Sequence, residues 1–371
     1  MKNKIVELIA ANVEGLTAAE IADLIEIPPK PELGDFAFPC FRLAKTMRKA
    51  PQMIANDIKE AIGDVDFLQE IQVQGAYLNF FVKKELFIET MVTASMADDF
   101  GSSTEGNGQT ICIDYSSPNV AKNFHVGHLR TTIIGNSLYK IYSKLGYKVV
   151  RINHLGDWGT QFGKLIVAYK AWGSEEAVKK DGVAELMKLY VKFHEEAEKN
   201  PELNDEARAW FAKMEHGDEE ALKIWQWFKD ISLIEYKRTY DLLGMDFDYY
   251  LGESFYRDKT DDVVKRLTDA NLLTESEGAK IVNLDAYDMA PCLILKNDGS
   301  SIYATRDIAA IFYRKETYNF VKCLYVTGQE QKLHFKQVFK VVELLGNEWA
   351  KDQLVHIPYG LVSLEGAKLS T

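Results

Sequence analysis

The chain has 371 residues, of which 47% are hydrophobic and 27% are charged, a composition that is ordinary for a folded protein of two or three domains. Its formal net charge of −11 weighs against a nucleic-acid binder, because phosphate contacts rely on Lys and Arg, although a basic stripe can lie on an acidic protein. The apolar stretches are shorter than the ~20 residues of a membrane-spanning helix, and Glu7 and Glu14 argue against a signal or transit peptide, so we expect a cytoplasmic protein.

Residues 1 to about 105 predict a small α+β domain. A helical pattern opens the chain, the turn-rich PPKPELGD follows, and a helical stretch from Phe41 to about Ile62 precedes the strand-like VQGAYLNFFV. Residues 98–108, DDFGSSTEGNG, have the polar, Gly- and Ser-rich composition of a linker.

From residue 109 the sequence alternates between strands and helices, which predicts an α/β fold with a Rossmann-like, doubly wound parallel sheet. TICIDYSS and KVVRINHL are expected strands on either side of a helix over 126–145. Residues from about 174 to 294 predict a largely helical insertion. The strands CLYVTG and LVHIPYGLVS then complete the sheet, in a domain that we place at 106–371.

The four cysteines, Cys40, Cys112, Cys292 and Cys323, are far apart in the sequence. This spacing contains no CxxC motif and no zinc-binding pattern, so we predict no metal site built by the protein. In a cytosolic chain we expect reduced, mostly buried thiols.

The motif HVGH, residues 125–128, falls where a loop meets the start of a helix. Two histidines three residues apart face the same side of a helix N-terminus, where they can donate hydrogen bonds to phosphate oxygens and where the helix dipole favours anions. Gly127 allows the backbone to approach a base or a phosphate closely. Taken alone, the motif fits equally well two histidines that are hydrogen-bonded locally.

Several other segments occur together with this motif. HVGH resembles the HIGH motif of class I aminoacyl-tRNA synthetases, and KLST, residues 368–371, resembles the start of their KMSK loop. SSPN, NHLGDWGTQFG, YATRDIAA and EQKLHFKQVF resemble arginyl-tRNA synthetases in particular, and GDFAFPCFRLAK and GAYLNFF resemble the N-terminal extension of that family. The resemblance covers essentially the whole chain, with the motifs in the family's order.

On the nucleotide side, the resemblance implies an ATP-binding site in which Gly127 lies near adenine. The other residues of this implied ATP-binding site are Lys122, His125, His128, His334 and Lys368. His125, His128 and Lys368 would be the catalytic residues, because they stabilise the charge on the phosphate. Thr371 occupies the position of a second loop lysine.

The resemblance also implies an arginine pocket made of Asp114, Asn119, Tyr303, Asp307 and Gln331. Carboxylates suit this task because a guanidinium is planar, always charged and rich in N–H donors. Asn119 and Gln331 would hold the α-amino end, and Tyr303 would pack on or bond to the guanidinium. Alternatively, Asp307 is only the N-cap of a helix.

Other polar and aromatic residues leave more than one interpretation open. His154 is either a substrate contact or a buried structural histidine, whereas Asp157 and His356 are expected to be structural. Trp225 and Trp227 favour core packing over stacking on RNA. In the first domain, Phe36 and either Tyr77 or Asn79 could contact the elbow of a tRNA, as the family's extension does, or could serve folding alone.

The function implied is an arginine–tRNA ligase that uses ATP, with Mg²⁺ carried by the nucleotide, to activate L-arginine and transfer it to tRNA(Arg). We expect a monomer that has no membrane partner. We also expect the chain to stop before the anticodon-binding domain. Two alternatives remain: another HIGH-type nucleotidyltransferase, or a non-catalytic paralogue acting as a binding module.

Overall fold

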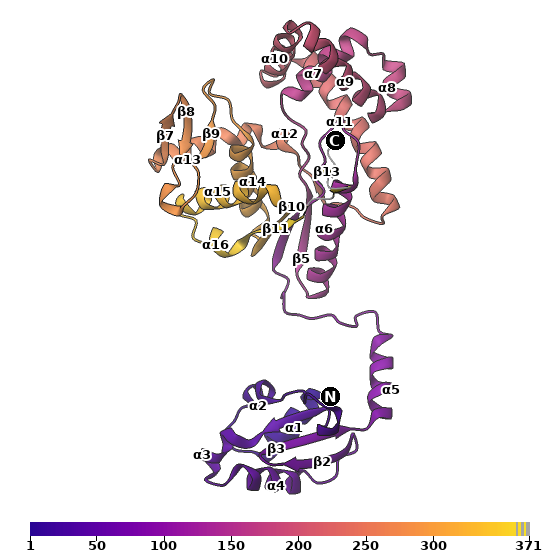
Figure 1. Ribbon diagram of the computed structural model, residues 1–371, viewed down its shortest axis with the longest axis vertical. Helices are drawn as coiled ribbons and strands as arrows, with labels where there is room; N and C mark the ends of the chain where they lie inside the picture. Colours follow the sequence, from indigo (N-terminus) through magenta and orange to yellow (C-terminus); the bar gives the residue numbers. More distant parts are fainter. Residues whose placement is uncertain (361–362, 365–366, 369–371) are drawn as a thin grey trace. The chain divides into compact units, whose positions relative to one another are not determined.

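The computed structural model describes residues 1–360, 363–364 and 367–368 (Figure 1). The chain forms two compact units, Met1–Gly101 and Ser102–Thr371. None of the helices in the described ranges is both long and apolar enough to cross a membrane. The cysteines at 40, 112, 292 and 323 are free and buried, as expected.

The first unit packs helices on a three-stranded antiparallel sheet of order β1-β3-β2. Gly75, whose φ is 61°, allows the tight turn in which Gln74 pairs with Tyr77. The core lies between this sheet and helices α1 and α4. The elements are α1 (Lys2–Asn12), α2 (Ala18–Leu24), η1 (Pro31–Leu33), β1 (Phe36–Pro39), η2 (Cys40–Leu43), α3 (Ala44–Met47), α4 (Pro51–Ile62), β2 (Leu68–Gln74), β3 (Tyr77–Val82) and α5 (Lys84–Ser95).

The single helical stretch predicted over 41–62 is wrong, because the structure breaks it into η2, α3 and α4. Arg48 adopts a left-handed conformation with a φ of 52°. Pro51 starts α4, and Ala50 before it is extended. A proline clashes with a preceding helical turn and restricts the residue before it, so a new helix has to begin there.

The second unit is built on a five-stranded sheet of order β11-β10-β4-β5-β6 in which every pairing is parallel. This confirms the predicted α/β class. Its main elements are β4 (Thr110–Asp114), α6 (Val126–Lys144), β5 (Lys148–Asn153), β6 (Tyr249–Tyr250), α14 (Tyr303–Tyr318), β10 (Lys322–Gly328), η5 (Gln329–Gln331), α15 (Lys332–Leu344), α16 (Ala350–Gln353), β11 (Leu354–Tyr359), β12 (Ser363–Leu364) and β13 (Ala367–Lys368).

The strand order of this sheet determines where a ligand site is expected. From β4 the chain builds β5 and β6 on one side, and the later strands β10 and β11 lie on the other side. The direction of winding therefore reverses between β4 and β10. In open parallel sheets such a reversal leaves a crevice at the carboxyl ends of the strands, where ligands bind.

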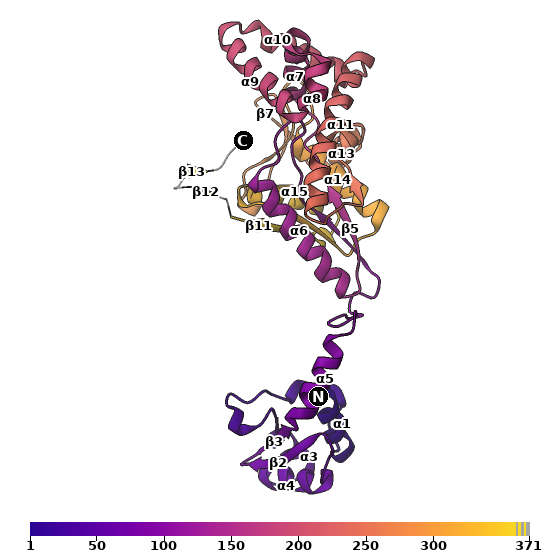
Figure 2. The same ribbon diagram turned by 90° about the vertical axis from the view of Figure 1, so that its right-hand side faces the viewer.

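Two groups of elements lie between β5 and α14 in the sequence. Helices α7–α10 gather at one end of the second unit, and α11 extends from them (Figures 1 and 2). The small antiparallel sheet β7-β8-β9 belongs to the other group. The elements are α7 (Thr160–Trp172), α8 (Glu175–Asp181), α9 (Val183–Lys199), α10 (Glu202–Glu215), α11 (Glu219–Leu242), α12 (Glu253–Tyr256), η3 (Arg257–Lys259), α13 (Thr260–Asp269), β7 (Leu273–Ser276), β8 (Ala279–Val282), η4 (Asp285–Tyr287) and β9 (Cys292–Leu295).

Helices α7 and α10 approach each other closely at Gly163. A Cβ placed on Gly163 would lie 2.0 Å from the backbone oxygen of Ala207 and 3.1 Å from the nitrogen of Phe211. We expect Gly163→Ala to lower the midpoint of thermal unfolding, because overpacking costs about 1–3 kcal/mol and exceeds the ~0.5–1 kcal/mol that Ala gains over Gly in a helix. Gly360→Ala is the control, since its Cβ would meet no atom of the described residues within 4 Å. Equal midpoints for the two variants would contradict this packing argument.

Candidate functional site

A cavity of about 760 Å³ lies at the carboxyl ends of the strands, at the reversal between β4 and β10. Segments that follow β4, β5 and β10 line it, together with the first turns of α6, α14 and α15. Nine of the residues predicted from sequence are among those lining it: Asp114, Asn119, His125, Gly127, His128, Tyr303, Asp307, Gln331 and His334.

The two histidines of HVGH stand at the start of α6, with His125 as its N-cap. The Nδ1 atom of His125 accepts a hydrogen bond from the backbone N–H of Gly127 at 2.9 Å, and the Nδ1 atom of His128 accepts one from the N–H of His125 at 3.3 Å. Because each Nδ1 is an acceptor, each neutral ring carries its proton on Nε2. The motif is hydrogen-bonded locally, and it also leaves two Nε2–H groups to donate elsewhere.

The electrostatic environment keeps both rings neutral at pH 7. Burial, the neighbouring ring of His125 and the charge of Lys122 lower the pKa of His128 to about 4. Burial and Lys122 also lower the pKa of His125. The ring centroids lie 3.9 Å apart, and a Cβ on Gly127 would lie 2.7 Å from Cε1 of His125. Gly127 is therefore required for the position of that ring.

Asn119 reaches the cavity from the loop between β4 and α6, where it forms a bridge with Gly156. A Cβ on Gly156 would lie 2.0 Å from Oδ1 of Asn119. The glycine of NHLGDWG is thus needed for the side chain of Asn119 to lie in this position.

Asp307 lies inside α14, not at its start, so its predicted alternative role as an N-cap is wrong. Its Oδ2 atom is 2.6 Å from Nε2 of His334, and its Oδ1 atom is 3.7 Å from Nε2 of His154. Burial raises the pKa of Asp307, but the hydrogen bond from His334 and the charges of both histidines and Arg314 outweigh burial and lower it. The carboxylate is therefore ionised at neutral pH.

Asp114 is paired with Arg314, a residue that the sequence analysis missed. Nη2 of Arg314 lies 2.8 Å from Oδ2 of Asp114 and donates to Nδ1 of His154 at 3.3 Å. Oδ1 of Asp114 accepts from the hydroxyl of Ser117 at 3.0 Å. Arg314 is fully buried, and Nε and Nη1 have no hydrogen-bond partner within the described part of the chain. Arg314 follows Asp307 by seven positions, which places both on one helix face, and this spacing was the available sequence signal.

Glu253 is a further carboxylate in the cavity that the sequence analysis missed. It begins α12, and its Oε2 atom lies 3.0 Å from Nη2 of Arg306. Burial raises the pKa of Glu253, against the opposing effect of Arg306. The negative charges of Asp114 and Glu253 are thus each neutralised by an arginine, whereas the carboxylate of Asp307 interacts with two histidines.

Among the described residues, Lys122 does not line the cavity, and Lys368 is described only in its backbone. Lys122 extends over the ring of Tyr190, with Nζ 5.9 Å from its centroid, although its charge acts on both histidines of HVGH. The backbone of Lys368 belongs to β13, while its side chain and all of Thr371 lie outside the described residues.

Asp157 and His356, which were predicted to be structural, both form hydrogen bonds within the protein. The buried carboxylate of Asp157 binds Nζ of Lys229 at 2.6 Å and the backbone N–H of Ser254 at 2.8 Å. The carbonyl of Asp157 accepts from the indole of Trp225 at 2.7 Å. His356 bonds to the hydroxyl of Thr327 at 2.9 Å. The contacts of Asp157 fix the loop after β5 against α11 and α12, whereas that of His356 joins β11 to β10.

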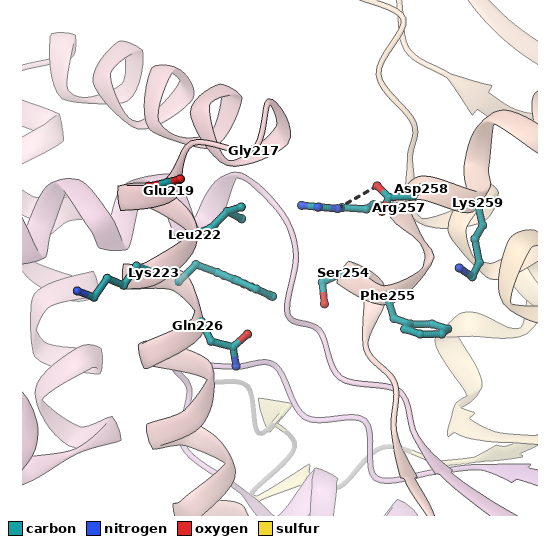
Figure 3. Close-up of a pocket in the computed structure, with 11 residues that line it drawn as sticks. Gly217, Glu219, Leu222, Lys223, Gln226, Ser254, Phe255, Arg257, Asp258 and Lys259 are labelled. Carbon is teal, nitrogen blue, oxygen red and sulfur yellow. Dashed lines mark hydrogen bonds and ion pairs between the residues drawn. The ribbon is translucent and has the colours of Figure 1, made fainter.

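Trp225 also lines a second cavity, of about 670 Å³, between α11 and the segment 254–259 (Figure 3). Arg257 and Asp258 stand on one side of it, across from Leu222 on α11, while the ammonium group of Lys223 points away. The guanidinium of Arg257 lies 4.9 Å above the ring of Trp158. None of the residues predicted to bind ATP or arginine lines this cavity among the described residues.

Comparison with known proteins identifies the family. The model of the family described as "tRNA synthetases class I (R), catalytic domain" matches residues 91–371, and "Arginyl tRNA synthetase N terminal domain" matches residues 3–82. The chain belongs to the arginyl-tRNA synthetase family. These matches do not favour the alternative of a different HIGH-type nucleotidyltransferase.

Curated members of the arginyl-tRNA synthetase family are similar over the whole chain. The arginine–tRNA ligase of Alkaliphilus metalliredigens is 56% identical over 372 aligned positions, covering 100% of this chain and 66% of the relative. That of Clostridium perfringens is 57% identical, covering 100% and 65%. The chain thus spans slightly less than two thirds of the length of these relatives.

Solved structures show the same fold at low sequence identity. Arginyl-tRNA synthetase from Plasmodium falciparum matches with a TM-score of 0.67 at 24% identity, over 98% of this chain and 66% of that one. The enzyme from Thermus thermophilus matches with a TM-score of 0.68 at 21% identity, over 100% and 67%. Both support the predicted architecture.

Proposed function

We propose that this chain activates L-arginine with ATP and transfers it to tRNA(Arg). The observation that carries the proposal is a cavity that is lined both by the two histidines of HVGH and by Asp307. An ATP phosphate and an amino acid can meet there at the carboxyl ends of the strands.

The proposed reaction has two steps. The carboxylate of arginine attacks the α-phosphorus of ATP, which forms arginyl-adenylate and releases pyrophosphate. The 2′-hydroxyl of the terminal adenosine of the tRNA then attacks the carbonyl carbon, forms the ester and releases AMP. No enzyme nucleophile is needed, so His125 and His128 act by donating hydrogen bonds to the phosphate, and the site acts by alignment.

Asp307 is the proposed anchor of the guanidinium. A substrate cation gains most from a carboxylate that is not already in an ion pair with an arginine or a lysine, and within the described part of the chain Asp307 pairs with His334 and His154. Asp114 forms a wall of the pocket in its pair with Arg314, and Tyr303, whose ring centroid lies 4.7 Å from that of His334, packs beside the anchor. Asn119 and Gln331 are left to bind the α-amino end. His334 thus belongs to the arginine side in this proposal.

Magnesium is proposed to arrive with ATP. Within the described ranges no group of three or more His, Cys, Asp and Glu side chains is arranged to hold a metal ion. The negative charges of Asp114 and Glu253 are already neutralised by arginines. These carboxylates are therefore not free to bind Mg²⁺, which suits an ion that is held by the phosphates of ATP rather than by the protein. When bound, the ion would offset the charge of the phosphates.

ATP–pyrophosphate exchange tests the proposed function directly. The chain is assayed with arginine, lysine, citrulline and glutamine, each with and without tRNA(Arg), and arginine binding is measured by calorimetry. We expect exchange with arginine alone, because lysine and the neutral analogues leave the carboxylate of Asp307 incompletely paired. Pyrophosphate exchange that depends on another amino acid instead of arginine would overturn the proposal. So would the absence of both arginine binding and arginine-dependent exchange in every condition.

His128→Ala is expected to slow exchange by about 100-fold or more, the cost of losing one preorganised donor to the reacting phosphate. Arginine affinity should stay within about twofold, since His128 belongs to the nucleotide side. The exposed residue His216, replaced with Ala, is the matched control. A loss of arginine affinity in His128→Ala would show that the two subsites are assigned wrongly.

A further inference from the structure

The loop that connects β4 to α6 has an unfavourable backbone. Ser116, Ser117 and Ala121 have φ angles of 73°, 46° and 62°, in the left-handed region that residues with a side chain rarely adopt. Each such residue costs on the order of 1 kcal/mol and persists only where surrounding contacts enforce it. This loop carries Asn119 and leads directly into His125, so its conformation determines where both side chains lie.

Three hydroxyl groups on α11 contact this loop, in addition to the bonds that the N–H groups of Ser116 and Ser117 make to Thr131 and Asn153. Ser232, Tyr236 and Tyr240 are spaced four residues apart, which places them on one face of the helix. The hydroxyl of Ser232 accepts from the N–H of Ala121 at 2.9 Å. The hydroxyl of Tyr240 lies 2.7 Å from Oγ of Ser116 and accepts from Nδ2 of Asn153 at 2.9 Å.

Tyr236 makes the most unusual of these contacts. Its single hydroxyl donates to two backbone carbonyls of the loop, that of Asn119 at 2.6 Å and that of Lys122 at 2.7 Å. The side chain is fully buried, so no solvent can replace these bonds. Tyr236 therefore closes the loop around Ala121, the residue with a φ of 62°.

The same two tyrosines reach the histidines through a line of rings. The ring centroid of Phe124 lies 6.2 Å from that of Tyr236 and 5.8 Å from that of Tyr240. The centroid of His128 lies 5.4 Å from Phe124 and 3.9 Å from His125. A displacement of α11 would therefore shift the loop backbone and both histidine rings of HVGH.

The other half of α11 belongs to the core of the helical cluster. Ala221 and Phe228 are fully buried together with residues of α7, α9 and α10. Figure 1 shows α11 extending from that cluster along the second unit. One continuous helix thus joins the core of the inserted helices to the loop that lines the cavity.

We propose that Ser232, Tyr236 and Tyr240 are positioning residues, through which α11 holds the strained 116–124 loop so that Asn119, His125 and His128 are aligned for amino-acid activation. The inference rests on the proposed function for its kinetic consequence. Its structural part, the control of the loop by α11, stands independently of which substrate binds.

Tyr236→Phe tests the proposal because it keeps the buried ring and removes only the hydroxyl. The matched control is Tyr115→Phe: Tyr115 is also fully buried, and its hydroxyl has no hydrogen-bond partner within the described part of the chain. Amide hydrogen exchange of peptides covering 116–124, kcat and KM for arginine-dependent pyrophosphate exchange, and the thermal midpoint are measured for both variants.

We expect Tyr236→Phe to speed amide exchange in the loop and to lower kcat at least tenfold, with KM for arginine changed less than threefold. Tyr115→Phe should match the wild type in loop exchange and in kcat. Ser232→Ala, which removes a single bond to the loop, should speed loop exchange as well and serves if Tyr236→Phe is poorly folded. Loop exchange in Tyr236→Phe and Ser232→Ala that equals the control would overturn the proposal.

The two proposals fail in different ways. A wild-type chain without arginine-dependent pyrophosphate exchange would count against the proposed function, while faster loop exchange in Tyr236→Phe would still support the role of α11. The opposite outcome is a wild type with normal kinetics and variants whose kcat and loop exchange are unchanged. That outcome would contradict the positioning role and leave the proposed function intact.

Discussion

Asp307→Asn should weaken the binding of L-arginine by about 3–5 kcal/mol, the usual cost when a buried charge loses its partner. The amide keeps the shape of the side chain but removes the negative charge, and its NH₂ group faces the N–H donors of the guanidinium instead of accepting from them. The loss should fall on arginine affinity, since Asp307 is bound by His334 and lies beside His154, not beside the rings of HVGH. Calorimetric titration with L-arginine measures the effect.

Asp261→Asn, an exposed change of the same type on α13, is the control for the loss of one negative charge. The thermal midpoint of each variant separates a binding defect from unfolding. Arginine affinity within a factor of three of the wild type in Asp307→Asn would remove Asp307 from the pocket and leave the guanidinium without its proposed anchor.

Arg314→Met should lower the free energy of unfolding by about 3–5 kcal/mol, because it leaves the carboxylate of Asp114 buried without its cation. Asp114 is 5% exposed, and Arg314 is fully buried, so water cannot replace the ion pair. We expect arginine binding to fall as well, since His154 loses the donor that holds its Nδ1. Chemical denaturation followed by tryptophan fluorescence measures the stability.

The double variant Asp114→Asn with Arg314→Met is the decisive comparison. Removing both charges avoids the uncompensated carboxylate, so the double variant should be more stable than Arg314→Met alone. A double variant that is less stable than the single one would show that the two residues contribute independently and that their pairing at 2.8 Å is not the stabilising contact.

The sequence predicted the residues of the cavity better than it predicted their interactions. His125, His128 and Asp307 could be named because they lie in short motifs that resemble those of a known family, and the reversal between β4 and β10 brings them together. The partner of Asp114 could not be predicted in the same way. Arg314 lies two hundred positions further along the chain than Asp114, and only the folded sheet places it beside β4.

The role of α11 was hidden for a different physical reason. Tyr236 and Tyr240 form part of an amphipathic pattern that is fully explained by core packing, so their hydroxyl groups gave no separate signal. Likewise, nothing in SSPNVAKN indicates left-handed backbone at Ser116, Ser117 and Ala121, since these residue types do not require it. The first unit shows the reverse case, where Pro51 did signal the helix break that was overlooked.

The position of β10 in the middle of the sheet has a consequence for synthesis of the chain on the ribosome. Strand β4 is nearly all buried in the finished sheet, yet its pairing edge for β10 stays open until Lys322–Gly328 has been made. With roughly 200 residues between them and translation at about 5–20 residues per second, that edge is exposed for about 10–40 s. During this interval Ile111, Cys112 and Ile113 present an open strand edge with apolar side chains to any neighbouring nascent chain, so β4 is a segment that a chaperone has reason to shield.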